Sequence, residues 1–278
     1  MENIIFKAEN IDGDMKLADY MKRRLGFSSA LLTKVKFGGV TLNGEVVTMR
    51  ARVKSGDEIC VSMPSDEASE IEPMPIELDI VYEDEHILAV NKPSDMPTHP
   101  SRGNHLPTLA NAVAAYLGAP FVFRAINRLD RGTSGIVLIA KNAYAAARLG
   151  RAMKERKIHK KYVARVAGVP SPREARIDAP IRRAVEGELK RIVAEDGKPA
   201  ITDYKVTRVE GDGESSLCEI ALHTGRTHQI RVHMAYIGHP LIGDFLYGED
   251  SPEGYFLTCC ELTFPHPITD ETVMVRCK

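Results

Sequence analysis

The sequence predicts an α+β protein in which a small N-terminal domain precedes a larger domain built on a mixed, mostly antiparallel sheet. In the second part of the chain, strand-like stretches outnumber helix-like ones and do not alternate with helices in the rhythm of a doubly wound sheet. Residues 62–75 are rich in proline, serine and acidic side chains and lack apolar periodicity, which is typical of a linker. We therefore expect domains over 1–63 and 76–278, joined by a linker over 64–75.

Two short helices and a hairpin are expected in the N-terminal domain. Residues 16–26 place apolar side chains at helical spacing and end in a glycine, whereas residues 28–39 begin with a serine cap. Asn43-Gly44, the commonest signal of a tight hairpin, lies between two strand halves over 40–47. A turn and a strand follow over 53–63. Basic side chains on the helices are compatible with an RNA-binding surface and equally with a solvated helix face.

The larger domain is expected to contain more strands than helices. Two strands surround an acidic turn over 76–93, and a buried apolar strand follows over 135–142. Further strands are expected over 160–168, 200–210, 215–224 and 272–277. Helices are expected over 106–118, 143–157 and 226–238.

Composition excludes several function classes. The 278 residues contain no apolar run long enough for a membrane span and no basic start followed by an apolar stretch, so we expect a cytoplasmic protein without a membrane partner. The five cysteines are odd in number and lack zinc-site spacing, which favours reduced thiols. Nucleotide-binding and metalloprotease motifs are absent from the sequence, and we expect no cofactor, no metal and a monomer.

Charge is distributed unevenly along the chain. Residues 66–85 carry nine acidic and no basic side chains, so the rest of the chain has a net charge of +8 although the whole carries −1. Five basic residues crowd into 154–161, and others lie on the first two predicted helices. The pattern is typical either of a track for nucleic-acid phosphates or of ordinary solvated faces.

Asp130 lies in the stretch NRLDRGTSG, directly before the apolar run IVLIA. A carboxylate at that place is expected to be half-buried and to need a partner. Arg226, His228 and Arg231 in HTGRTHQIRVH are candidate partners, and Tyr162 supplies an aromatic neighbour. From these residues alone two interpretations stay open. Asp130 is either part of a structural ion pair or a reactive carboxylate, acting as a nucleophile or moving a proton.

The larger domain resembles the RluA-type pseudouridine synthases over nearly all of 76–278. Five blocks carry the resemblance in the family's order, and they are IVYEDEHILAVNKPSDMPTHPS, NRLDRGTSGIVLIAKN, KKYVARVAG, HTGRTHQIRVHMAYIGHPLIGDFLYG and LTCCELTFPHP. The resemblance implies the pseudouridine synthase fold, RNA as partner and an isomerase that needs no cofactor. Such an enzyme flips a uridine out of its stack, cuts the N-glycosidic bond and rejoins the base through carbon.

The resemblance also implies residue roles. Asp130 corresponds to the catalytic aspartate, Tyr162 to the tyrosine that stacks on the target base, and Arg231 to the arginine that pairs with the aspartate. Arg128 is expected to fill the gap left by the flipped nucleotide, and Leu257 to give an apolar contact near the base. We expect four further side chains to contact RNA, namely Arg226, His228, Lys160 and Lys161.

Two positions depart from the family's pattern. Asn127 stands where the family has His or Gln, and Cys259 stands where it usually has Ala. Neither replaces Asp130, so activity is still expected, whereas the effect of Asn127 on the loop or on RNA contacts stays open.

The N-terminal domain resembles the small S-four-type RNA-binding domain, on the frame GGVTLNGEVV followed by VKSGDEICV. By family analogy the target is expected to be large-subunit ribosomal RNA. Two alternatives remain, a non-catalytic RNA-binding or ribosome assembly factor on the same scaffold, and an N-glycoside hydrolase. The hydrolase would need a second well-placed acid, for which the sequence offers only Asp244, expected to hold a turn.

Overall fold

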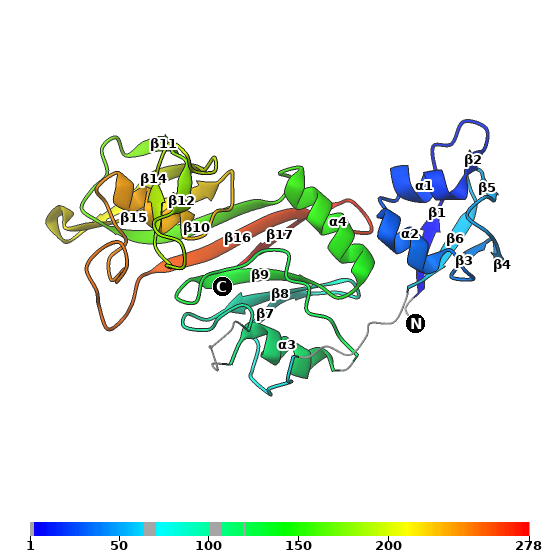
Figure 1. The fold of residues 1–278 in the computed structure, drawn as a ribbon, viewed down its shortest axis with the longest axis horizontal. Helices are drawn as coiled ribbons and strands as arrows, with labels where there is room; N and C mark the ends of the chain where they lie inside the picture. Colours follow the sequence, from blue (N-terminus) through cyan, green and yellow to red (C-terminus); the bar gives the residue numbers. More distant parts are fainter. Residues whose placement is uncertain (1–2, 64–70, 101–106, 119, 278) are drawn as a thin grey trace.

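The computed structural model describes residues 3–63, 71–100, 107–118 and 120–277 (Figure 1). Residues 64–70 of the predicted linker lie outside the described residues. Within the described parts of the chain, no helix is long and apolar enough to cross a membrane.

The N-terminal part contains a four-stranded antiparallel sheet in the order β1-β6-β3-β4. Its strands are β1 (Asn3–Lys7), β3 (Val40–Leu42), β4 (Glu45–Val46) and β6 (Glu58–Ser62), and a separate pair is formed by β2 (Met15–Lys16) and β5 (Arg52–Val53). Two helices, α1 (Leu17–Arg23) and α2 (Ser29–Val35), occupy the predicted ranges. The Ser28 hydroxyl caps α2 by accepting from the amide of Leu31, as predicted. Asn43 and Gly44 have φ angles of 51° and 86°, so the predicted tight hairpin is confirmed.

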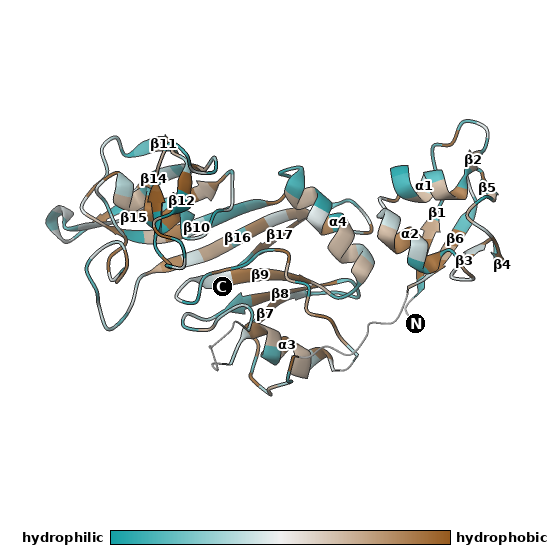
Figure 2. Cartoon of the chain, in the orientation of Figure 1, coloured by the Kyte–Doolittle hydropathy of each residue, from teal (hydrophilic) through white to brown (hydrophobic). Residues whose placement is uncertain are grey.

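A nine-stranded sheet forms the body of the remaining chain, in the order β11-β14-β15-β10-β16-β9-β8-β7 with β17 paired to β16. All pairs are antiparallel except the parallel contact between β16 and β9, which confirms the predicted mixed, mostly antiparallel sheet. Hydrophobic residues concentrate along its central strands, for example β9 (Figure 2).

Seven of these nine strands lie in ranges predicted to be strands, whereas β11 and β16 were not predicted. The strands are β7 (Ile80–Glu83), β8 (Ile87–Lys92), β9 (Ser134–Ala140), β10 (His159–Ala167), β11 (Glu174–Asp178), β14 (Ile201–Glu210), β15 (Ser215–Leu222), β16 (Leu257–Pro265) and β17 (Thr272–Arg276). A small hairpin lies beside the sheet and consists of β12 (Ile181–Arg183) and β13 (Arg191–Val193).

Three longer helices and one short turn of helix accompany the sheet. They are α3 (Leu109–Leu117), α4 (Ala143–Lys154), η1 (Gly211–Gly213) and α5 (Gln229–Tyr236). The helix predicted to begin at residue 226 begins only at Gln229, because His228 has a left-handed backbone with φ of 57° that a helix cannot include. The residues before it therefore form a loop that lines a cavity.

The first turn of α4 joins the two parts of the chain. Tyr144 belongs to the hydrophobic cluster of the N-terminal part, where its ring centroid lies 4.6 Å from that of Phe27 and 5.4 Å from that of Phe6. Its hydroxyl donates to the carbonyl of Leu25. The N-terminal sheet and helices are thus packed against α4, the helix whose other end borders the cavity described next (Figure 1).

Candidate active site

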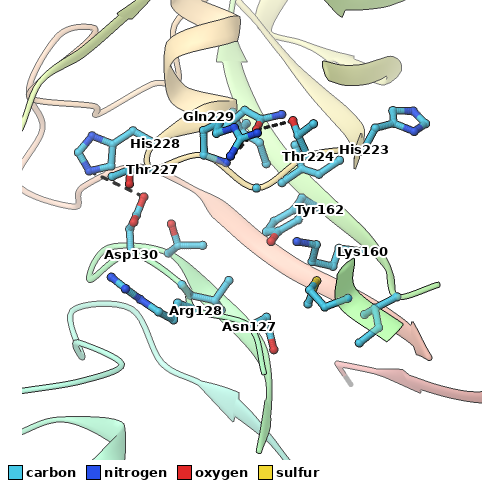
Figure 3. A pocket seen from close by; sticks show the side chains of 18 of the residues that line it. Asn127, Arg128, Asp130, Lys160, Tyr162, His223, Thr224, Thr227, His228 and Gln229 are labelled. Atoms are coloured by element: carbon cyan, nitrogen blue, oxygen red, sulfur yellow. Dashed lines mark hydrogen bonds and ion pairs between the residues drawn. The ribbon is translucent and has the colours of Figure 1, made fainter. Parts of the chain in front are cut away.

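A cavity of about 710 Å³ opens where three chain segments meet. They are residues 125–133 before β9, residues 153–162 from the end of α4 into β10, and residues 222–231 from β15 into α5, with Leu257 of β16 completing the lining. Figure 3 shows Asp130, Arg128, Lys160, Tyr162 and His228 among the residues that line it. The structure therefore brings together side chains that the sequence separates by about a hundred residues.

Hydrogen bonds on both sides fix the loop that carries Asp130. The amide group of Asn127 donates to the carbonyl of Ile136 at 2.9 Å, and its oxygen accepts from the amide of Leu138 at 2.8 Å. On the other side, the Thr98 hydroxyl donates to the carbonyl of Leu129 at 2.8 Å. Asn127 therefore ties the loop to β9, which gives this departure from the family pattern a structural role. The Asp130 side chain keeps 35% of its surface exposed, so a substrate can reach it.

Close packing of two strands places this loop against the floor of the cavity. Gly135, at the start of β9, has φ of +110°, and a Cβ atom there would lie 2.3 Å from the carbonyl oxygen of Cys259. Only glycine allows the approach, since a side chain would collide with the backbone of β16. The parallel pairing of β9 with β16 thus brings Asp130 to the same cavity as Leu257 and Tyr162.

Arg231 does not form the expected direct pair with Asp130. Its guanidinium donates two hydrogen bonds to Asp244, at 2.7 and 2.6 Å, and both side chains are almost fully buried. Asp244 also accepts from the backbone amide of Leu246 at 3.1 Å, so it holds a turn, as expected, and holds Arg231 as well. Burial explains this pairing. The Asp244 carboxylate has no contact with solvent, so it gains more from a bidentate partner than the half-exposed Asp130 carboxylate does. Arg231 stays within electrostatic range of Asp130. Burial acts to lower the pKa of the Arg231 guanidinium, but the negative charges of Asp244 and Asp130 oppose it, and the pKa is raised.

Among the described residues, it is instead His228 that lies beside the Asp130 carboxylate. Its Nε2 lies 3.9 Å from the Asp130 Oδ2, and its Nδ1 shares a hydrogen bond of 2.9 Å with the Tyr247 hydroxyl. Burial lowers the pKa of His228 and so favours the neutral ring, although the negative charge of Asp130 acts in the opposite direction. The left-handed backbone at His228 points this ring toward Asp130 ahead of α5 (Figure 3).

Tyr162 forms the inner wall of the cavity. Its side chain is 5% exposed, and burial, followed by the neighbouring Cys259 thiol, raises its pKa well above the ordinary value. The ring therefore remains neutral and presents a flat, apolar face. Leu257, on the adjacent strand β16, lines the same cavity. An aromatic wall and an aliphatic contact suit a planar heterocycle.

The predicted RNA contacts separate into two groups. Arg128, Arg226, His228 and Lys160 line the cavity, and the Arg226 Nε donates to the carbonyl of Pro199 at 3.0 Å. Lys161 does not line it, because successive residues of a strand point to opposite faces. Its ammonium lies 3.7 Å from Glu261 on the other side of the sheet, so Lys161 lies outside this cavity, and its contact with RNA stays a prediction.

Sequence reasoning missed one charged residue of the site. Lys92 is fully buried, and its ammonium donates to the carbonyls of Pro93 and Met96, both at 2.7 Å, and of Arg131 at 3.3 Å. Burial lowers the pKa of Lys92 to about 8, against the effect of nearby Asp130. The lysine therefore ties the Asp130 loop to the end of β8. Lys92 belongs to the NKP segment of the first block that resembles the family, and this position could have identified it from the sequence.

The chain is similar to proteins of one family in both sequence and structure. The family profile described as RNA pseudouridylate synthase matches residues 86–236. The chain is 41% identical over 259 residues to the uncharacterized RNA pseudouridine synthase YjbO of Bacillus subtilis, covering 90% of each protein. It is 39% identical over 254 residues to the ribosomal large subunit pseudouridine synthase D of Vibrio parahaemolyticus, covering 84% of this chain and 77% of that protein. The structure of human RNA pseudouridylate synthase domain containing 1 matches with a TM-score of 0.62 and 31% identity, over 76% of this chain and 86% of that one.

Proposed function

The chain belongs to the RNA pseudouridine synthases and isomerises uridine in RNA, and from this premise we propose that Asp130 is its catalytic carboxylate. One observation carries the proposal. Among the described residues that line the cavity, Asp130 is the only carboxylate, and the others include six Lys or Arg side chains, which are Arg128, Lys154, Arg156, Lys160, Arg226 and Arg231. A single acid within a basic cavity suits one reactive group acting on a polyanion.

The surrounding side chains support a division of labour around a flipped uridine. Leaving the stack costs the nucleotide a few kcal/mol. Stacking on the Tyr162 ring offsets that cost, by roughly 1–3 kcal/mol for an aromatic–base contact. Arg128 extends from the same loop as Asp130 and fills the vacated space in the RNA. Leu257 limits the position of the base from the adjacent strand.

Large-subunit ribosomal RNA is the proposed substrate. The relative from Vibrio parahaemolyticus carries that target in its name. The N-terminal part adds a second basic surface, with Arg23 at the end of α1 and Lys34 at the end of α2. We assign this part to the S-four-type RNA-binding domains on its hairpin and turn frame, and its packing on α4 supports an RNA path shared with the cavity.

Asp130→Asn tests the catalytic assignment, because it removes the charge and keeps the size. Pseudouridine formation is expected to be abolished, whereas RNA affinity changes little. Substantial turnover by this variant would contradict the proposed role of Asp130. Release of free uracil by the wild-type protein would instead favour an N-glycoside hydrolase, for which the cavity lacks a second carboxylate among its described lining residues.

A strain without this protein tests the substrate. Pseudouridine mapping of its ribosomal and transfer RNA is expected to show at least one large-subunit position that remains uridine. The wild-type gene restores that position and the Asp130→Asn gene does not. Normal ribosome assembly and full modification with the Asp130→Asn gene would favour a non-catalytic assembly factor.

A further inference from the structure

Lys160 is a cation of the cavity whose ammonium has no partner among the described residues. It lies two residues before Tyr162 on β10, so both side chains point to the same face of the strand. Its ammonium would lie 3.7 Å from a Cβ atom at Gly225, which places it between β10 and the loop before α5. Figure 3 shows its side chain directed into the cavity. No described residue forms a hydrogen bond or ion pair with it.

An unpaired ammonium in this place is costly for the empty enzyme. Lys160 is half-buried, and the loss of water around it lowers its pKa. Its neighbour in electrostatic range is the Cys259 thiol, whose own pKa burial raises to about 12, so the thiol supplies no negative charge at pH 7. A buried charge without a partner is normally compensated by an anion. The substrate is the remaining source of that anion.

The reaction generates an anion inside the cavity. When the bond between uracil N1 and ribose C1′ breaks, its electron pair stays on the base and spreads to the two carbonyl oxygens. The base then uses a pair from its ring to form the new bond between C5 and C1′, loses the proton from C5 and gains one at N1. The same uracil anion arises whether Asp130 attacks C1′ or removes the ribose 2′ proton first. No oxidant or reductant is required.

We propose that the Lys160 ammonium donates a hydrogen bond to a carbonyl oxygen of the detached uracil and stabilises its negative charge during cleavage and reattachment. The proposal rests on the role proposed for Asp130, because that role fixes the ribose at the outer end of the cavity. With C1′ at the half-exposed Asp130, the base extends inward onto the deeply buried Tyr162. The ammonium beside that wall meets the edge of the base.

A backbone phosphate is a poorer match for this position. Phosphates remain hydrated and follow the mouth of the cavity, where Lys154 and Arg156 are exposed. Lys160 lies deeper, next to Tyr162 and Cys259, where an ammonium interacts more strongly with charge that develops during the reaction. Lys160 is thus expected to affect the rate of the reaction on the base more than the affinity for RNA.

Lys160→Met is the test, and Lys161→Met is the matched control, because Lys161 is the adjacent lysine on the other face of β10. Single-turnover rates at saturating RNA, the dissociation constant and its dependence on salt are measured for both. We expect Lys160→Met to lower the saturating rate by about 10²–10³-fold, the loss typical of one donor to a developing oxyanion. Its affinity and salt dependence stay within about twofold of wild type. Lys161→Met keeps the wild-type rate.

Two results would overturn the proposal. If the saturating rate of Lys160→Met stays near wild type while affinity falls and the salt slope decreases by about one, Lys160 binds a phosphate. If rate and affinity are both unchanged, Lys160 has no role in the reaction. A thermal midpoint no lower than that of wild type verifies folding, and Lys160→Gln is measured in the same way as a second variant. Full activity of Asp130→Asn would refute the role of Asp130, and this result does not depend on the rates and affinities measured for the Lys160 variants.

Discussion

Asp244→Ala is expected to be among the most destabilising single substitutions in this protein. It leaves the Arg231 guanidinium, only 4% exposed, without the carboxylate that accepts two of its hydrogen bonds at 2.6 and 2.7 Å. The carboxylate also accepts from the backbone amide of Leu246, which loses its partner too. Breaking a buried pair by removing one partner costs about 3–5 kcal/mol, mainly because the other charge remains buried and uncompensated.

Asp203→Ala is the matched control for this prediction. Asp203 accepts two hydrogen bonds from Arg176 at 2.7 and 3.0 Å, a similar bidentate contact, and its Oδ2 also lies 2.6 Å from the His223 Nε2. However, the side chains of Asp203, Arg176 and His223 are 37%, 58% and 41% exposed. Water and salt screen such a pair, so its loss is expected to cost at most about 1 kcal/mol. Urea unfolding followed by far-ultraviolet circular dichroism gives both free energies, and this signal is suitable because the chain contains no tryptophan for fluorescence.

An Asp244→Ala variant that lost no more free energy of unfolding than Asp203→Ala would refute this reasoning. A double variant sharpens the test. Arg231→Met combined with Asp244→Leu removes both charges and fills the space with apolar groups, so much of the lost stability is expected to return. If the double variant is as unstable as Asp244→Ala, the loss comes from packing and the turn, and the uncompensated charge is not its cause.

Three further predictions test the loop, the pH response and the contact between the two parts of the chain. Asn127→Ala removes both hydrogen bonds that hold the Asp130 loop to β9 and is expected to cost about 1–3 kcal/mol, with a lower saturating rate in the same single-turnover assay. Burial lowers the pKa of His233 in the folded state, so the unfolded state binds a proton at this side chain at a higher pH than the folded state does. The free energy of unfolding therefore falls as the pH decreases through 6.5, and His233→Gln is expected to weaken this pH dependence between pH 7 and 5. Tyr144→Ala removes an aromatic ring from the shared cluster and is expected to cost about 3–5 kcal/mol and to increase proteolysis between the N-terminal part and α4, whereas an unchanged cleavage pattern would contradict a stable contact.

Local patterns in the sequence predicted the local structure well. The serine cap at Ser28 and the hairpin at Asn43-Gly44 depend on neighbouring residues, so both were predictable and are confirmed. The early start predicted for α5 was wrong because the left-handed conformation of His228 is imposed by its surroundings in the cavity. The short β12–β13 hairpin was missed because its strands have only three residues each.

Contacts through space were less predictable than the residues that make them. Asp130 and Tyr162 were identified from the sequence, and the structure brings them to one cavity. The partner of Arg231 was not, because the choice between Asp130 and Asp244 depends on which carboxylate is buried more deeply. Strand alternation, in contrast, is sufficient by itself to separate Lys160 from Lys161, since adjacent residues of a strand face opposite sides.

The pairing of Arg231 with Asp244 has a consequence for Asp130. A carboxylate held in a bidentate ion pair has its oxygens engaged by donors and must break those bonds before it attacks carbon or accepts a proton. Here Asp244 occupies the guanidinium, and the neighbouring His228 lies 3.9 Å from Asp130, beyond hydrogen-bond distance. Arg231 still contributes a positive field, because the two groups interact electrostatically. In the part of the chain that the structure describes, no side chain donates a hydrogen bond to the Asp130 carboxylate, so the reactive role proposed for Asp130 requires no ion pair to be broken first. Asp244 maintains this arrangement by binding the Arg231 guanidinium.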